Sequence, residues 1–191
     1  MSPYDPSEPR ISEAAEQVIL VDAEDRPVGT APKLEAHRRA LMHRAFSVIV
    51  LDAAGRLLLQ RRARGKYHSP GLWSNSCCGH PRPGEELAAA AGRRLREEMG
   101  FTCALTPLGR LHYAVAFDNG LSENEVVTLF AGRHDGPIPF DPAEVGEVAW
   151  VNLPDLLAGV AARPDDYTYW FRLYLTDHLA TLRAGLGAAA G

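Results

Sequence analysis

The sequence lacks three features that would place a protein in a special class: a long apolar run, an excess of basic residues and an even number of cysteines. No apolar segment approaches the roughly 20 residues of a membrane-spanning helix, so no membrane partner is expected. The 20 Lys and Arg residues are outnumbered by 24 Asp and Glu residues. This balance argues against a nucleic-acid partner, because affinity for a polyanion comes mainly from clustered cations.

The cysteines number three, and two of them are adjacent at Cys77 and Cys78. An odd count does not favour a disulfide framework. The first ten residues are acidic and rich in proline, without the basic and then apolar pattern of a secretory signal. We therefore expect a cytoplasmic protein.

The composition is that of a globular protein, with a hydrophobic fraction of 46% and a charged fraction of 23%. A chain of 191 residues suits a single domain. We expect residues 16–183 to form this domain. Residues 1–15 and the Ala/Gly-rich residues 184–191 are expected to be flexible.

Apolar patterning and residue propensities predict the secondary structure. Strands are expected at residues 17–22, 45–52, 56–62, 74–78, 111–117, 125–133 and 147–151, and helices at 86–99, 154–160 and 169–182. The second and third strands form the clearest β-hairpin. Residues 33–43 are expected to form a short helical or irregular connector, and residues 65–73 a loop. Because the elements do not alternate as βαβ units, we predict an α/β (α+β) sandwich around a mixed β-sheet.

Residues 76–101 combine cysteine, histidine and a charged helix that Gly100 is expected to end as a left-handed cap. The apolar stripe of this helix consists of Leu87, Ala91 and Leu95. Arg94 and Glu98 lie at the edge of the stripe, so a functional role is predicted for both. Arg93 and Glu97 turn outward and are expected to form an ordinary surface ion pair.

Seven residues of this stretch fall at the spacing of the Nudix box, G-x5-E-x7-R-E-U-x-E-E-x-G-U, where U is a bulky aliphatic: Gly79, Glu85, Arg93, Glu97, Glu98, Gly100 and Phe101. Arg94 stands where the box has a glutamate. In Nudix hydrolases that glutamate belongs to the acidic cluster that holds divalent ions for pyrophosphate hydrolysis. The resemblance implies a Nudix-like α/β/α sandwich, whereas Arg94 argues against hydrolysis.

A wider resemblance, over roughly residues 17–180, is to the type 1 isopentenyl-diphosphate delta-isomerases, which have the Nudix fold. It is carried by residues 33–37, 43–47, 60–62, 123–125 and 169–170, and by Pro-Gly-Leu-Trp-Ser-Asn-Ser-Cys-Cys-Gly-His-Pro at 70–81. The box of this family carries the same change from glutamate to arginine. The resemblance implies conversion of isopentenyl diphosphate to dimethylallyl diphosphate in isoprenoid biosynthesis, through protonation, a tertiary carbocation and deprotonation.

Three histidines and two glutamates could enclose one divalent ion: His37, His43, His80, Glu123 and Glu125. Each residue alone is more often an ordinary surface or core group, and the resemblance is what favours the site. Mixed nitrogen and oxygen ligands suit Mn²⁺, Mg²⁺ or Zn²⁺ equally. The resemblance also implies that Glu98 binds a Mg²⁺ ion together with the substrate diphosphate.

The basic positions that match the family are Lys33, Lys66, Arg94 and one of the adjacent pair Arg61 and Arg62. Strand alternation lets one of the two arginines face inward, and the resemblance selects Arg62. These four cations are expected to bind the diphosphate. The alternative for the arginine pair is that both only solubilise the end of a strand.

Moving a double bond needs one proton added and another removed on opposite sides of the substrate. We assign Glu125 as the acid and Cys78 as the base, with Tyr113 near Glu125 to share its proton; the reverse assignment stays open. Trp170 can stabilise the carbocation through its π face. Cys77 is expected to be a small buried hydrophobe.

Three functions are compared: the isomerase, a Nudix pyrophosphohydrolase of a nucleoside diphosphate derivative, and a non-catalytic module in which the metal cluster is structural. The predicted partner is a small-molecule diphosphate. The predicted assembly state is a monomer or a weak homodimer.

Overall fold

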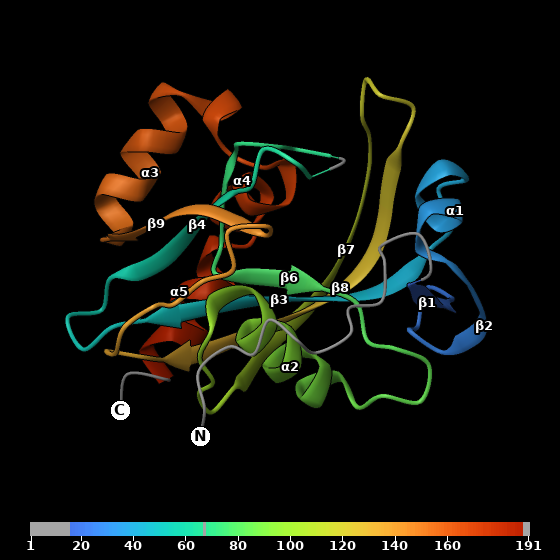
Figure 1. The fold of residues 1–191 in the computed structure, drawn as a ribbon, viewed down its shortest axis with the longest axis horizontal. Coiled ribbons are helices and arrows are strands. Elements are labelled where there is room, and N and C mark those ends of the chain that lie inside the picture. Colours follow the sequence, from blue (N-terminus) through green and yellow to red (C-terminus); the bar gives the residue numbers. More distant parts are fainter. Residues whose placement is uncertain (1–15, 67, 189–191) are drawn as a thin grey trace.

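The computed structural model describes residues 16–66 and 68–188. Its strands form one mixed sheet (Figure 1). The strands are β1 Gln17–Val21, β2 Pro27–Pro32, β3 His43–Leu51, β4 Leu57–Arg62, β5 Trp73–Ser74, β6 Cys77–Gly79, β7 Thr106–Ala116, β8 Ser122–Arg133 and β9 Val145–Val151. The helices are α1 Lys33–Arg38, α2 Leu87–Met99, α3 Leu153–Ala162, α4 Tyr169–Thr176 and α5 Leu179–Ala188, with a 3-10 turn at Pro164–Asp166.

Strand β3 lies at the centre of the sheet and divides two apolar cores. It pairs with β8 in parallel along its whole length and with β6 antiparallel. Because side chains alternate along a strand, Ala45, Ile49 and Leu51 pack toward α3, α4 and α5. Phe46, Val48 and Val50 instead pack toward α2. Helices on both faces of a mixed sheet confirm the predicted α/β sandwich.

The predicted hairpin of β3 and β4 is correct only at its turn. The two strands pair at Leu51 and Leu57, and β4 then turns away to pair with β9 and β5. Where β3 and β4 separate, side chains of the segment that contains β5 and β6 form hydrogen bonds with the backbone groups that the two strands do not share. Ser76 Oγ donates to the carbonyl of Leu58 at 2.7 Å and accepts from the amide of Val50 at 2.8 Å. The separated strands therefore leave a gap that this segment occupies.

Helix α2 forms largely as predicted. Gly100 ends it in the left-handed region with φ 76°, and Glu98 is buried on its inner side. The predicted ion pair of Arg93 with Glu97 forms, but Arg93 is half-buried rather than on the outer surface. Its guanidinium donates to both oxygens of Glu85, at 2.7 and 2.9 Å, and its bond to Glu97 is longer at 3.2 Å. Arg93 thus ties the helix to the turn before it.

Several boundaries differ from the prediction. Strand β2 was not predicted, because its two terminal prolines are tolerated only at an edge, which is where β2 lies. The helix expected at 169–182 is two helices, α4 and α5. The tail expected to be flexible from residue 184 begins inside α5, since alanine and leucine favour helix. Residues 1–15, also expected to be flexible, lie outside the described part of the chain.

None of the helices within residues 16–66 and 68–188 is both long enough and apolar enough to span a bilayer.

Candidate active site

A single cavity lies where β3 and β4 separate, and twelve of the thirteen predicted site residues line it. They are Lys33, His37, Arg62, Lys66, Cys78, His80, Arg94, Glu98, Tyr113, Glu123, Glu125 and Trp170. The thirteenth, His43, lies beside Glu125, with 3.4 Å between its Nε2 and Glu125 Oε1. Residues from both faces of the sheet can meet here because the gap between the two strands interrupts the sheet.

Four of the predicted metal ligands converge. One ligand atom from each of His37, His43, His80 and Glu125 lies within 4.8 Å of the others. The parallel register of β3 and β8 places His43 directly beside Glu125. Glu125 Oε1 is 3.0 Å from His80 Nε2 and 3.4 Å from His43 Nε2. α1 contributes His37, and the turn after β6 contributes His80.

The protonation of these rings suits metal binding. His43 Nδ1 donates to the carbonyl of Leu41 at 2.8 Å, so Nε2 of the neutral ring carries a lone pair. This Nε2 is buried and has no hydrogen-bond partner among the described residues. Burial lowers the pKa of His37 to about 3, and it also lowers the pKa of His80. Neutral imidazoles are the ligating form, so the donor set is compatible with a divalent metal ion.

Glu123, also predicted as a ligand, lies beside this cluster and contacts other groups. Tyr113 Oη is 2.9 Å from an oxygen of Glu123 and 2.9 Å from an oxygen of Glu125, so it bridges the two carboxylates. Burial and the charge of Glu125 raise the pKa of Glu123 well above its usual value. Burial alone would also raise the pKa of Glu125, but the nearby His43 and His80 side chains lower it well below its usual value. The role of Glu123 as a ligand stays a prediction.

The Cys78 thiol lies in the wall of the cavity. Its Sγ is 3.2 Å from Ser47 Oγ and 3.3 Å from Asn75 Oδ1. Burial raises the pKa of Cys78 to about 12, although the hydrogen bond with Ser47 lowers it, so the group is a thiol at neutral pH in this structure. Its neighbour Cys77 points into the apolar core under α2, which confirms the prediction of a small buried hydrophobe.

Three of the predicted diphosphate ligands already contact carboxylates. Lys33 Nζ is 2.8 Å from Glu16, and Lys66 Nζ is 2.8 Å from Glu144. Arg94 contacts Glu98, lies 2.8 Å from Glu97 and 3.5 Å from Glu144. These pairs hold the cations in place around the cavity before any anion enters.

Arg62 differs from these three cations. Its Nε is buried without a hydrogen-bond partner among the described residues, and its guanidinium lies 5.4 Å from the ring centre of Trp170. A buried donor without a partner is costly unless an acceptor arrives. Arg61, the other member of the pair, is exposed, as strand alternation requires, and lies 3.4 Å from Glu147. Arg62 is thus the arginine of the pair that can contact an anion in the cavity.

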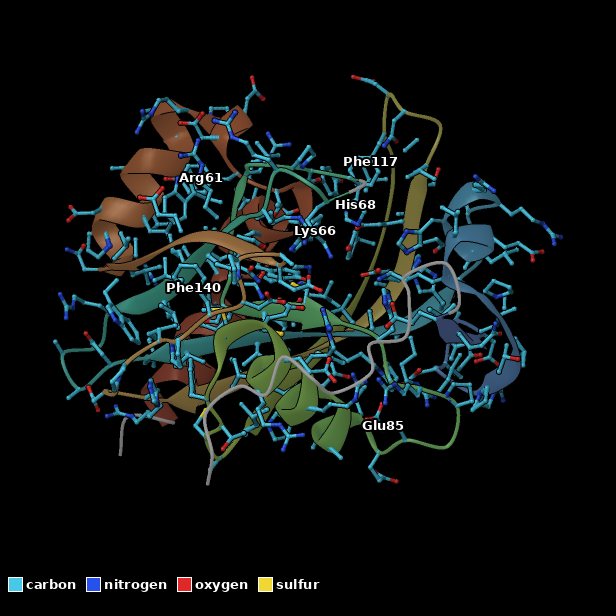
Figure 2. The ribbon with its side chains drawn as sticks, in the orientation of Figure 1. Arg61, Lys66, His68, Glu85, Phe117 and Phe140 are labelled. Carbon is cyan, nitrogen blue, oxygen red and sulfur yellow. The ribbon has the colours of Figure 1, made fainter. Side chains whose placement is uncertain are left out.

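The structure also adds residues that the sequence did not single out. His68 reaches from the loop after β4 toward the end of β7, where its ring stacks on Phe117 at 5.6 Å (Figure 2). His68 was not predicted as a site residue because it lies in a Gly- and Pro-rich segment that was predicted as a loop. Ser47 carried a usable signal, because it is a polar residue inside the otherwise apolar run at residues 45–51. Glu16 and Glu144 carried none, since their partners are far away in sequence.

Comparison with known proteins agrees with this fold. The profile of the NUDIX domain matches residues 41–171. The crystal structure of DR0079 from Deinococcus radiodurans aligns with a TM-score of 0.63 at 24% identity, over 77% of this chain and 90% of that one. The MutT protein from Methanosarcina mazei aligns with a TM-score of 0.61 at 19% identity, over 75% of this chain and 94% of that one. The chain is therefore a Nudix-fold protein.

Relatives with higher identity define the family. The Isopentenyl-diphosphate Delta-isomerase of Burkholderia multivorans is 52% identical over 171 residues, 90% of this chain and 94% of the relative. Isopentenyl-diphosphate Delta-isomerase 2 of Aromatoleum aromaticum is 50% identical over 177 residues, 92% of this chain and 93% of the relative. The chain belongs to the type 1 isopentenyl-diphosphate delta-isomerase family of the Nudix superfamily.

Proposed function

We propose that this protein is an isomerase that converts isopentenyl diphosphate to dimethylallyl diphosphate in isoprenoid biosynthesis. The observation that carries the proposal is that Cys78 and Glu125 line one cavity together with four cations. The names of relatives at 52% and 50% identity support it. Arg94, in the place of a hydrolase glutamate, is ion-paired with Glu98 and supports an isomerase over a hydrolase.

The positions of Cys78 and Glu125 suit proton transfer on two sides of a substrate. They lie on β6 and β8, which flank β3 on its opposite edges, opposite Ser47 and His43 respectively. In the forward direction one of the two groups adds a proton to the terminal alkene carbon, and the other removes one from the carbon on the other side of the cation. The protonated thiol of Cys78 and the lowered pKa of Glu125 favour the reverse of the first assignment, with Cys78 as the acid and Glu125 as the base. Tyr113, which contacts both Glu123 and Glu125, can pass the proton between these carboxylates.

We expect the diphosphate end of the substrate to contact cations and its hydrocarbon end to contact Trp170. Lys33, Arg62, Lys66 and Arg94 would bind the diphosphate, with bidentate contacts where arginine is present. Trp170 is buried in the cavity wall and its ring would stabilise the tertiary carbocation away from water. The partner is thus a small-molecule diphosphate. We further propose that the protein is cytoplasmic. We also propose that it is a monomer or a weak homodimer, and sedimentation at micromolar concentration would check this assembly state.

We also propose two divalent-ion positions. His37, His43, His80 and Glu125, with Glu123 beside them, would hold one ion, and the donors suit Mn²⁺, Mg²⁺ or Zn²⁺. Glu98 would hold a Mg²⁺ ion that enters with the diphosphate. When bound, these ions supply positive charge that balances the carboxylates and the diphosphate within the cavity.

The product distinguishes the isomerase from a hydrolase. Purified protein incubated with isopentenyl diphosphate and Mg²⁺ is expected to form dimethylallyl diphosphate, and in heavy water the product should carry deuterium. A panel of nucleoside diphosphate derivatives is expected to release neither phosphate nor nucleoside monophosphate. Absence of conversion with Mg²⁺, Mn²⁺ and Zn²⁺ alike would refute the proposed function, and hydrolysis of a panel member would favour the pyrophosphohydrolase.

Removing metal distinguishes an enzyme from a structural metal module. We expect a chelator to abolish isomerisation while circular dichroism at 25 °C stays unchanged, because neither large apolar core includes the four converging ligands. Adding Mn²⁺, Mg²⁺ or Zn²⁺ should restore activity and raise the melting temperature, since a ligand at 100 times its Kd stabilises by about 2.7 kcal/mol. Loss of the fold upon chelation would instead support the structural module.

A further inference from the structure

The Cys78 thiol contacts a defined set of polar groups at the edge of an apolar core. The antiparallel register of β3 and β6 sets Ser47 directly opposite Cys78. Ser47 Oγ lies 3.2 Å from Cys78 Sγ and 2.9 Å from the hydroxyl of Tyr174 on α4. On its other side, Cys78 Sγ is 3.3 Å from Asn75 Oδ1. The sulfur therefore has a polar group on each side.

The orientation of the Asn75 amide sets the direction of these hydrogen bonds. Its Nδ2 donates to the carbonyls of Val48 and Cys77, at 3.0 and 2.9 Å, so Oδ1 must face Cys78. A carbonyl oxygen can only accept, so the Cys78 thiol donates its proton to Asn75. The sulfur lone pairs are then left to accept from Ser47. Ser47, having donated its proton, accepts in turn from Tyr174.

Burial keeps this chain of bonds intact. Ser47, Asn75 and Tyr174 are each 1% exposed, so water does not compete for their polar atoms. The same amide also connects the thiol to the indole of Trp170. Ser74 Oγ donates to Asn75 Oδ1 at 3.1 Å and accepts from Trp170 Nε1 at 3.0 Å.

We infer that Ser47, Asn75 and Tyr174 are positioning residues that hold the Cys78 sulfur in one orientation toward the substrate. The hydrogen bonds run from Tyr174 to Ser47, from Ser47 to Cys78 and from Cys78 to Asn75. This inference rests on the proposed isomerase function for its kinetic consequences. The orientation of the Cys78 thiol can be measured without turnover, so this part of the inference can be tested independently of activity.

Tyr174→Phe, Ser47→Ala and the double variant test the chain kinetically. We expect each single variant to lower kcat by about 10- to 100-fold with KM within about threefold, because misplacement of a reacting group is costly while diphosphate binding is untouched. Acting in series, the two changes should not multiply, so the double variant should match the slower single variant. Tyr167→Phe, which removes a tyrosine hydroxyl outside the cavity, is the matched control and should behave as wild type.

The S–H stretching band of Cys78, assigned by its loss in Cys78→Ser, gives a readout independent of activity. We expect this infrared band to shift and broaden in Ser47→Ala and, more weakly, in Tyr174→Phe. An unchanged band, unchanged kcat or fully multiplicative effects would overturn the inference. If Ser47→Ala does not fold, Tyr174→Phe alone decides it. A shifted band in a protein without isomerase activity would uphold the positioning and refute the proposed function.

Discussion

Replacing Cys78 with serine is expected to lower kcat at least about 10³-fold with little change in KM or in the melting temperature. Serine can keep the contacts to Ser47 and Asn75, which are hydrogen bonds that a hydroxyl also forms. The hydroxyl, however, is a far weaker acid than the thiol and cannot exchange protons with the substrate at a comparable rate. Conversion of isopentenyl diphosphate, measured with circular dichroism melting of the same samples, checks this result.

The other two cysteines provide the controls. Cys103 lies outside the cavity, so Cys103→Ser should retain wild-type kcat. Cys77→Ser places a hydroxyl in the apolar core under α2 and should reduce stability while leaving turnover largely intact. A kcat for Cys78→Ser within tenfold of wild type would exclude Cys78 as a proton-transfer group.

Glu125→Gln is expected to have a second large effect, because one side chain serves two purposes in the proposed site. Glutamine preserves the shape but removes the negative charge that faces His43 and His80. We expect kcat to fall at least about 10³-fold. We also expect metal content after dialysis to fall, because an amide is a weaker ligand than a carboxylate. Turnover and elemental analysis of the same preparation measure both effects.

Glu147→Gln is the matched control for Glu125→Gln. Glu147 is an exposed glutamate in β9 that contacts Arg61, so its replacement should alter neither kcat nor metal content. Normal turnover in Glu125→Gln would refute its role in proton transfer. Loss of turnover with full metal content would separate the two roles, leaving Glu125 as a proton-transfer group and the histidines as the metal ligands.

The sequence predicted the secondary structure best where the pattern is local. Helix α2 followed from its composition and from Gly100, whose left-handed conformation favours glycine. The hairpin of β3 and β4 was less accurate, because local patterning describes the turn and not the later course of the strands. The separation of β3 from β4 depends on Ser76, which bonds to both strands from outside the hairpin.

In the candidate site as well, the sequence predicted what depends on local motifs and did not predict contacts between distant residues. Motif and resemblance predicted its thirteen residues, and the structure brings twelve of them to one cavity and the thirteenth, His43, beside Glu125. The carboxylates that pair with the cations were missed. Glu16 is 17 positions from Lys33, and Glu144 is 78 positions from Lys66, so neither pair forms a sequence pattern.

By itself, the sequence determined the chemical groups of this protein: a cysteine and a histidine beside a charged helix, with Arg94 in place of a hydrolase glutamate. It could do so because residue type and short spacing are local properties. Only the tertiary structure decided which of these groups form hydrogen bonds and ion pairs with one another. Ser47 meets Tyr174 across 127 positions, and a contact of that range is set by packing between α4 and the sheet, which no local pattern encodes.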